Sequence, residues 1–204
     1  MRLLLIRHGE TADNVARTIG SRPPGPPLSE RGLEQATALA ASLAGTPLAA
    51  VHSSRALRAV QTASVVAEAL DVPHVELDGL LEIDAGDLEG LPYAEAMQGY
   101  AGTMQRWWVD PEARIPGGES GVGFMARFDR AVAAVEAAAG SPDATVAIVS
   151  HEAAICVWAS STATNLDAEF SRTHGVANTG VVVLEGSSVD GWRAAEWDGE
   201  PLSV

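Results

Sequence analysis

LLLIRHGETADN (residues 3 to 14) places an unbroken apolar run directly before an arginine, a histidine and a glutamate. A continuous run of leucine and isoleucine is typical of a strand that is covered on both faces. Arg7, His8 and Glu10 are expensive to bury unless a partner pairs with them. The stretch therefore predicts a buried strand that ends in a functional site.

The pattern around this stretch predicts the rest of the sheet. A second apolar run, ATVAIVS, covers residues 144 to 150, and shorter strands are predicted at 48–53 and 73–77. Apolar residues recur at helical spacing in segments 29–44, 55–70 and 124–140. Ser29 is a candidate cap for the first of these helices, although Gly32 stands where a capping box has an acidic residue. The segment 180–197 predicts an edge hairpin that turns between Gly186 and Gly191.

The order of these elements decides the fold class. Strands and helices alternate, with a helical middle, which is typical of a mostly parallel sheet with right-handed crossovers. We predict an α/β fold, a three-layer α/β/α sandwich, as one domain over residues 1–204 with a small helical cap-like insertion at about 83–120. A chain of 204 residues with 47% hydrophobic residues can fill such a core.

Composition limits the partners that we expect. No segment resembles a signal peptide or a membrane span, so the expectation is a soluble, cytoplasmic protein. The formal net charge of −14 argues against nucleic acid and anionic membranes as partners. All 13 basic residues are arginines, so an anion site must use guanidinium groups, backbone amides and imidazoles. Oligomeric state is not predicted.

Three strand ends carry polar residues, and ligands of open α/β sheets bind beyond the carboxyl ends of the strands. Arg7 and His8 follow the first strand, Ser53, Ser54 and then Arg58 follow the second, and Ser150 and His151 follow the run at 144–150. We expect two histidines and two arginines to meet at this edge. Glu82, in the loop after the third strand, can reach the same crevice.

At this point the chain resembles a family, the histidine phosphatase superfamily of phosphoglycerate-mutase-like proteins. The resemblance extends from residue 2 to about residue 185, and it rests on motifs in the family's order: LIRHGET followed by Asn14, PLSERGLEQA, SSRALRAVQTA, LEIDAGDLEG, PGGES, VSHEA and NTGVVVLE. Arg-His-Gly alone is a weak motif, but the whole set is specific. It implies a phosphohistidine mechanism with no metal or organic cofactor.

The resemblance assigns roles that suit the residue types. His8 is the expected nucleophile, and Arg7, Arg58 and His151 are expected to hold the phosphoryl group. Glu82 is the expected general acid and base. Asn14 is expected near the phosphate as a neutral donor, with Thr11, Arg17 and Ser21 as outer candidates.

Glu152 departs from the family pattern, in which glycine often follows the second histidine. Its backbone amide is still expected to face the phosphate. At a helix N-terminus its side chain can point outward, where a negative charge favours the helix dipole.

Hydrolysis of a small phosphorylated metabolite is the favoured function. A phosphoglycerate-mutase-type phosphotransferase is less favoured, because the region before His151 is short and lacks lysine, although Arg106 and Arg114 are possible contacts for a second anion. A non-catalytic phosphate-binding protein stays open because of Glu152. A metallohydrolase comes third, since no His-Glu-x-x-His pair is present.

The remaining distinctive residues are expected to be structural. Cys156 is expected to be a buried core thiol, and His52 a packing residue at a strand end. His74 and His174 are expected to be surface or structural residues. Met104, Trp107 and Trp108 are expected to pack under the insertion, although one of them can line the mouth of the site.

Overall fold

The computed structural model describes residues 1–202 and contains a seven-stranded sheet in the order β3-β2-β4-β1-β5-β6-β7. β3, β2, β4 and β1 pair in parallel, whereas β5, β6 and β7 continue the sheet in antiparallel fashion. The strands are β1 Arg2–Arg7, β2 Leu48–Ser53, β3 His74–Glu76, β4 Thr145–Ser150, β5 Val181–Ser187, β6 Gly191–Trp197 and β7 Glu200–Pro201.

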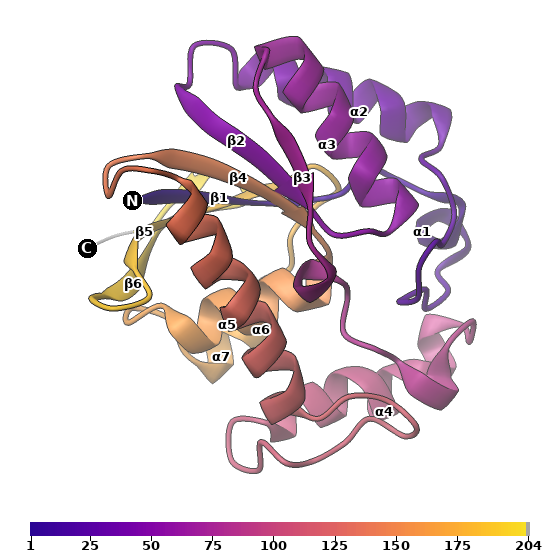
Figure 1. The fold of residues 1–204 in the computed structure, drawn as a ribbon. Coiled ribbons are helices and arrows are strands. Elements are labelled where there is room, and N and C mark those ends of the chain that lie inside the picture. The colour runs from indigo at the N-terminus through magenta and orange to yellow at the C-terminus, as the bar shows by residue number, and fades with distance from the viewer. Residues whose placement is uncertain (203–204) are drawn as a thin grey trace.

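Helices cover both faces of this sheet, as Figure 1 shows. α2 and α3 lie on one face, and α5, α6 and α7 lie on the other. The predicted α/β sandwich is confirmed. The helices are α1 Ala12–Ala16, α2 Glu30–Ser42, α3 Leu57–Leu70, α4 Tyr93–Arg106, α5 Gly121–Ala138, α6 Glu152–Thr162 and α7 Ala168–Thr173, with 3-10 turns η1 Asp78–Leu80 and η2 Gly86–Leu88.

The unbroken apolar run of β1 is explained by these two layers. Successive side chains of a strand point to opposite faces. Leu3 and Leu5 belong to the core cluster beneath α5 and α6. Leu4 and Ile6 belong to the cluster beneath α2 and α3. Both faces are therefore apolar, and β1 runs through the middle of the molecule to the sheet edge where His8 follows.

The loop after β1 is held against the start of α2. The Ser29 hydroxyl accepts from the Gly32 amide at 3.0 Å, so Ser29 caps the helix as predicted. It also donates to the Glu10 carboxylate at 2.9 Å. A Cβ at Gly9 would lie 2.6 Å from the Gly32 carbonyl oxygen, and one at Gly32 would lie 2.2 Å from the Glu10 carbonyl oxygen. The loop and the helix approach this closely only because both positions are glycine.

Replacing Gly9 by alanine is expected to lower the free energy of unfolding by about 1–3 kcal/mol, because the clash is with rigid backbone. Gly102→Ala is the matched control, since nothing lies within 4 Å of its added Cβ. Gly102 lies inside α4, so alanine there is expected to be neutral or to stabilise by up to about 1 kcal/mol. Urea unfolding of both variants tests this. Equal effects of the two substitutions would contradict the close approach.

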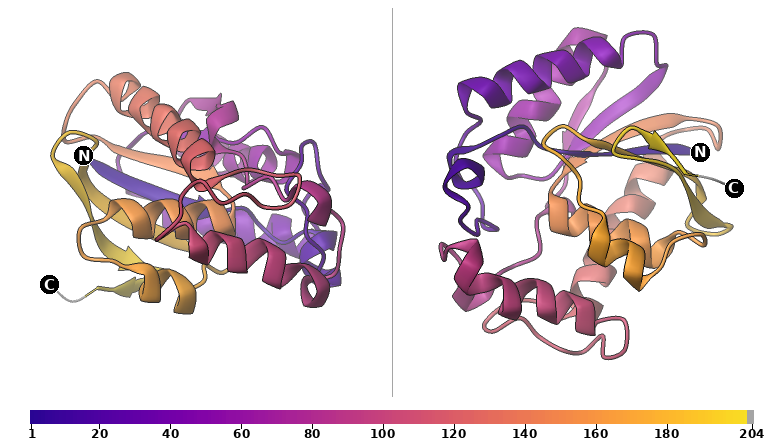
Figure 2. Two further views of the ribbon diagram at one scale, coloured as in Figure 1. Left: turned by 90° about the horizontal axis from the view of Figure 1, so that it is seen from below. Right: turned by 180° about the vertical axis from the view of Figure 1, so that it is seen from behind.

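The segment 83–120, where the cap-like insertion is predicted, contains η2 and α4. Figure 2 shows α4 on the far side of α5 and α6 from the sheet, facing the α1 loop. Backbone hydrogen bonds join the two segments, from the Ile19 amide to the Leu91 carbonyl and from the Gly90 amide to the Ile19 carbonyl. The site described below lies between these segments and the sheet.

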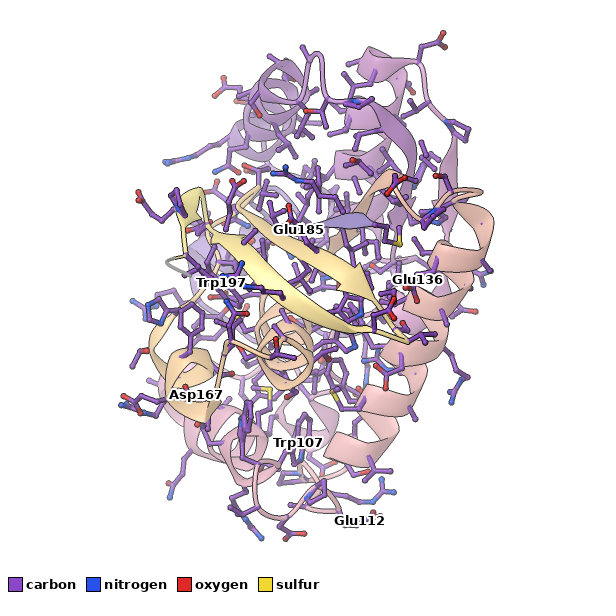
Figure 3. All side chains as sticks on the ribbon, turned by 90° about the vertical axis from the view of Figure 1, so that its left-hand side faces the viewer. Trp107, Glu112, Glu136, Asp167, Glu185 and Trp197 are labelled. Atoms are coloured by element: carbon purple, nitrogen blue, oxygen red, sulfur yellow. The ribbon has the colours of Figure 1, made fainter. Side chains whose placement is uncertain are left out.

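The helix predicted at 124–140 begins earlier, at Gly121, because the Ser120 hydroxyl caps it. The edge hairpin is confirmed as β5 and β6, which Figure 3 views with Glu185 and Trp197 labelled. Within residues 1–202 no helix has the length and apolarity that a membrane crossing requires.

Candidate active site

The carboxyl ends of β1 and β4 bring two histidines together. The His8 amide donates to the Ser150 carbonyl at 3.1 Å, and the Asn178 side chain donates to the His8 carbonyl at 3.0 Å. The His8 and His151 ring centroids lie 5.2 Å apart. Both side chains are buried. The backbone of the sheet edge therefore fixes both imidazoles.

The hydrogen bonds of His8 define its tautomer. Its Nδ1 lies 2.7 Å from the Gly9 carbonyl oxygen. A carbonyl only accepts, so Nδ1 carries the proton and Nε2 presents a lone pair. That lone pair accepts from Arg58 Nε at 3.0 Å. Burial, together with the charges of Arg58 and Arg7, holds the pKa of His8 well below its ordinary value. These contacts and the lowered pKa favour the neutral imidazole, whose Nε2 lone pair faces Arg58.

His151 is fixed in the opposite sense. Its Nε2 lies 2.7 Å from the Ser54 hydroxyl, and its Nδ1 accepts from Arg58 Nη2 at 3.0 Å. Since the guanidinium can only donate, the His151 proton is on Nε2 and is shared with Ser54. Burial and the neighbouring Arg58 hold the pKa of His151 well below its ordinary value. Arg58 thus connects both imidazoles.

The two predicted arginines each retain an unused buried donor. Arg58 also donates to the Gly20 carbonyl at 2.9 Å, but its Nη1 is buried without an acceptor. Arg7 donates from Nη1 to the Val176 carbonyl at 2.7 Å, while its Nε is buried without an acceptor. An unsatisfied buried N–H is costly, and a charged one more so. Both arginines also line the strand-end cavity described below, where their positive charge favours an anion.

Glu82 lies on the N-terminus of α6. Its Oε1 accepts from the Ile83 and Ala154 amides at 2.9 and 2.8 Å, and its Oε2 accepts from the Ala153 amide at 3.2 Å. These bonds favour the ionised carboxylate, but burial outweighs them and raises the pKa of Glu82 above its ordinary value. A carboxyl with a raised pKa next to a neutral imidazole is a common acid–base arrangement.

Arg127 holds the loop that carries Glu82. Its guanidinium donates to the Gly79, Leu81 and Glu82 carbonyls at 2.8 to 2.9 Å. It also pairs with Glu119 at 2.7 Å. All of its nitrogens are thus used to fix this loop against α5.

Glu152 does not point outward. It is the first residue of α6, but its Oε2 pairs with Arg7 Nη1 at 2.7 Å, and its side chain is 41% exposed. The outward orientation suggested by the helix N-terminus is therefore wrong for this residue. The largely covered guanidinium of Arg7, whose side chain is 12% exposed, offers a stronger electrostatic partner than the helix dipole.

Asn14 and Ser21, two further predicted phosphate contacts, differ in how their hydrogen-bond donors are used. The Asn14 Oδ1 accepts from the Thr11 amide and from Asn178, which leaves its amide nitrogen as the donor. The Ser21 hydroxyl donates to Glu89 and accepts from the Ala85 amide. The Ser21 hydroxyl hydrogen is thus used by Glu89, although Ser21 lines the strand-end cavity described below.

Two neighbouring cavities share part of their lining at this site. The strand-end cavity encloses about 50 Å³ and is lined by Arg7, His8, Thr11, Asp13, Asn14, Thr18, Ile19, Gly20, Ser21, Arg58, Glu82, Tyr93, Tyr100 and Glu152. A larger one, the α4/α6/α7 cavity, encloses about 370 Å³. Both are lined by Ile19, Glu82, Tyr93, Tyr100 and Glu152. Of the outer candidates, Thr11 lines the strand-end cavity, whereas Arg17 is exposed and does not.

Ser54, Asn178 and Arg127 are parts of this site that were not assigned from the sequence. Ser54 was visible at a strand end, and Asn178 within the NTG motif. Arg127 gave no signal, since an arginine in a helix is usually solvated.

The structure also places the other residues for which a structural role is predicted. Cys156, Met104 and Trp107 are buried, as predicted, and Met104 also lines the α4/α6/α7 cavity. His52 is buried. His74 accepts or donates a hydrogen bond with Ser53 at 2.8 Å. Among residues 1–202 no cluster of three or more histidine, cysteine or acidic side chains is arranged to hold a metal ion.

Comparison with known proteins decides the family. The model of the histidine phosphatase superfamily (branch 1) matches residues 3–198. The chain belongs to this superfamily. It is 35% identical over 153 residues to the adenosylcobalamin/alpha-ribazole phosphatase of Salmonella typhimurium, an alignment that covers 74% of each chain.

Alignments with two further proteins cover nearly all of the chain. It is 33% identical over 218 residues to the PE-PGRS family protein PE_PGRS11 of Mycobacterium tuberculosis, covering 97% of this chain but only 36% of that protein's length. The structure of mycobacterial glucosyl-3-phosphoglycerate phosphatase in complex with VO3 superimposes with a TM-score of 0.81 at 29% identity, covering 98% of this chain and 99% of the other.

Proposed function

We propose that this histidine phosphatase hydrolyses small phosphomonoesters through a phosphohistidine on His8. One observation carries the proposal: the lone pair of His8 Nε2 faces Arg58 Nε, and both residues line a cavity together with Arg7 and Glu82. A dianionic phosphoryl group in this cavity accepts from the guanidinium groups and takes over the Arg58 Nε–H from His8, which frees the lone pair of His8 Nε2.

The first step transfers the phosphoryl group to the enzyme. His8 Nε2 attacks phosphorus, the P–O bond to the alcohol breaks, and Glu82 gives its proton to the departing oxygen. Glu82 Oε2 accepts one amide, whereas Oε1 accepts two, so Oε2 is the oxygen with room for the proton. The Gly9 carbonyl stabilises the positive charge that develops on the imidazole through Nδ1–H.

The second step returns the enzyme to its starting state. Ionised Glu82 takes a proton from water as the water oxygen attacks the phosphohistidine. The P–N bond breaks, and inorganic phosphate leaves with His8 neutral. Arg7, Arg58 and the Asn14 amide nitrogen stabilise the oxygens in both steps.

Hydrolysis is favoured over a mutase reaction because Arg106 and Arg114, the possible contacts for a second anion, lie away from the site. Arg106 pairs with Asp110 at 3.3 Å, and Arg114 bonds the Gly118 carbonyl within its own loop. Neither lines the cavities beside His8. The phosphatases named above act, by their names, on phosphorylated metabolites, which supports a substrate of this class.

Phosphate release from a panel of sugar phosphates, phosphoamino acids and aryl phosphates across acidic to neutral pH tests the proposal. We expect turnover that is unchanged by a metal chelator. A complete lack of hydrolysis, with phosphate still bound, would favour the non-catalytic binding protein.

The shifted pKa values of Glu82 and His8 predict how kcat/KM depends on pH. As pH rises through the raised pKa of Glu82, the acid is lost and kcat/KM for alkyl phosphates falls; as pH falls through the lowered pKa of His8, the nucleophile is protonated and kcat/KM falls again. Glu82→Gln should lower kcat for alkyl phosphates by about 10²–10⁴-fold. It should spare the first turnover of 4-nitrophenyl phosphate, whose leaving group needs no proton. A burst of nitrophenol measures this, and an equal loss for both substrates would contradict the acid role.

Arg127 is predicted to act through Glu82 as a positioning residue. Arg127→Met should lower kcat for alkyl phosphates by about tenfold to 100-fold and affect the 4-nitrophenyl phosphate burst less, because a misplaced acid matters only where protonation is needed. Arg127→Lys should not rescue the activity, since lysine lacks the planar fork. Arg130→Met, an exposed arginine on the same helix, is the control. Parallel losses for both substrates would indicate a general structural role.

A further inference from the structure

The α4/α6/α7 cavity opens directly from the place of the leaving group. It shares Glu82, the proposed acid, with the strand-end cavity, so the alcohol part of a bound phosphomonoester lies at its entrance. Its volume of about 370 Å³ is within the range of small-ligand sites. Its walls come from α4, α6 and the end of α7.

Most of this wall is apolar. Side chains of α4 and α6 supply it, with Tyr100, Met104 and Cys156 buried. The apolar or aromatic lining residues are Ile19, Tyr93, Met97, Tyr100, Ala101, Met104, Ala153, Cys156 and Val157. An alcohol group gains from entering such a wall in proportion to its apolar surface.

The negative charge at the entrance is that of Glu152, because Glu82 carries the proton that the first step uses. Glu82 and Glu152 line both cavities. The one arginine among the described lining residues, Arg172, lies on the far wall and pairs with Glu169, and both of these side chains are more than half exposed. A carboxylate or second phosphate close to the reacting phosphate would meet the Glu152 carboxylate and no unpaired cation among the described residues of this wall.

Glu152 also occupies one of the hydrogen-bond donors of Arg7. Its Oε2 lies 2.7 Å from Arg7 Nη1, and its Oε1 faces Gly175, where an added Cβ would be 2.9 Å away. One donor of Arg7 is thus occupied by a carboxylate of the protein on the side of the α4/α6/α7 cavity. A second anionic group of the substrate would have to displace Glu152 to use it.

We infer, on the basis of the proposed phosphatase function, that the preferred substrates are phosphomonoesters of apolar alcohols without a negative charge near the phosphate, and that Glu152 excludes anionic ones. An alcohol with a cationic group two carbons from the phosphate oxygen is accepted, because Glu152 can pair with it.

Two matched substrate series test the inference. Methyl, butyl and hexyl phosphate have similar leaving groups, and kcat/KM should rise with length by up to about fourfold per methylene, the factor for complete burial. Ethyl phosphate, phosphoethanolamine and phosphoglycolate differ in the charge on the second carbon. Phosphoglycolate should be the poorest of the three.

Glu152→Gln should reduce the ratio of kcat/KM for phosphoethanolamine to that for phosphoglycolate roughly tenfold, as expected for removal of one partly exposed charge near the substrate. Glu95→Gln removes the same charge from an exposed position of α4 outside the cavity lining and should leave the ratio unchanged. A ratio that Glu152→Gln does not change, or a wild-type preference for phosphoglycolate, would overturn the inference. So would rates that are independent of alkyl length.

The corresponding phosphonates separate this inference from the phosphatase proposal, because they bind without turnover. Calorimetry on the wild-type protein should give the same order of affinities. If the phosphonates bind in the predicted order of affinity but none of the esters is hydrolysed, only the phosphatase proposal is refuted. If the esters are hydrolysed but neither the rates nor the affinities follow the predicted order, only the inference is refuted.

Discussion

Replacing His8 by alanine is expected to lower kcat/KM for phosphomonoesters by at least about 10⁴-fold, since a covalent route has no substitute once its nucleophile is removed. The remaining groups, Arg58, Arg7 and Glu82, still bind phosphate, so the affinity for inorganic phosphate should change much less than the rate. Steady-state kinetics and phosphate binding by calorimetry measure the two effects separately.

His74→Ala is the control for His8→Ala. His74 lies on β3 at the edge of the sheet, bonded to Ser53 and away from the residues that line the two cavities. It should keep nearly full activity. If His8→Ala folded normally and retained more than about a hundredth of the wild-type rate, His8 would not be the nucleophile.

Replacing Arg58 by alanine should lower kcat by about 10³-fold. Arg58 contacts both imidazoles and lines the strand-end cavity, so its loss removes positive charge where negative charge develops on the phosphoryl oxygens. Arg58→Lys should recover little, because the fork that reaches His8, His151 and Gly20 at once is lost.

The pH profile of Arg58→Ala distinguishes this role from simple loss of folding. The charge of Arg58 lowers the pKa of His8, so its removal should move the acidic limb of kcat/KM to higher pH. Arg55→Ala is the matched control, because Arg55 lies three residues earlier, is half exposed and pairs with Asp78 at 3.1 Å. An acidic limb that stays in place in Arg58→Ala would contradict the account, as would a rate within tenfold of wild type.

Much of this site is predictable because backbone periodicity places it. The apolar runs that end at Arg7 and Ser150 are neighbouring parallel strands of one sheet, so the residues that follow them must share an edge. Arg58, the second residue of α3, and Glu82, in the loop after β3, reach the same edge.

What the sequence does not predict depends on contacts between distant segments. The orientation of Glu152 is set by Arg7, which lies 145 positions earlier and meets it only in the folded chain. The Ser21 hydroxyl donates to Glu89. Arg127 donates to the Glu82 carbonyl and so fixes the loop that carries Glu82. α1 is too short at five residues to show a helical period.

Direct detection of a phosphorylated His8 tests the central claim most closely. Glu82→Gln treated with 4-nitrophenyl phosphate should accumulate the intermediate, because its formation needs no acid and its hydrolysis needs the base. After quenching in alkali, mass spectrometry should find one acid-labile phosphoryl group on the peptide that contains His8, and none in the double variant with His8→Ala. Release of nitrophenol with His8 unmodified, or with the phosphoryl group on another residue, would contradict the account.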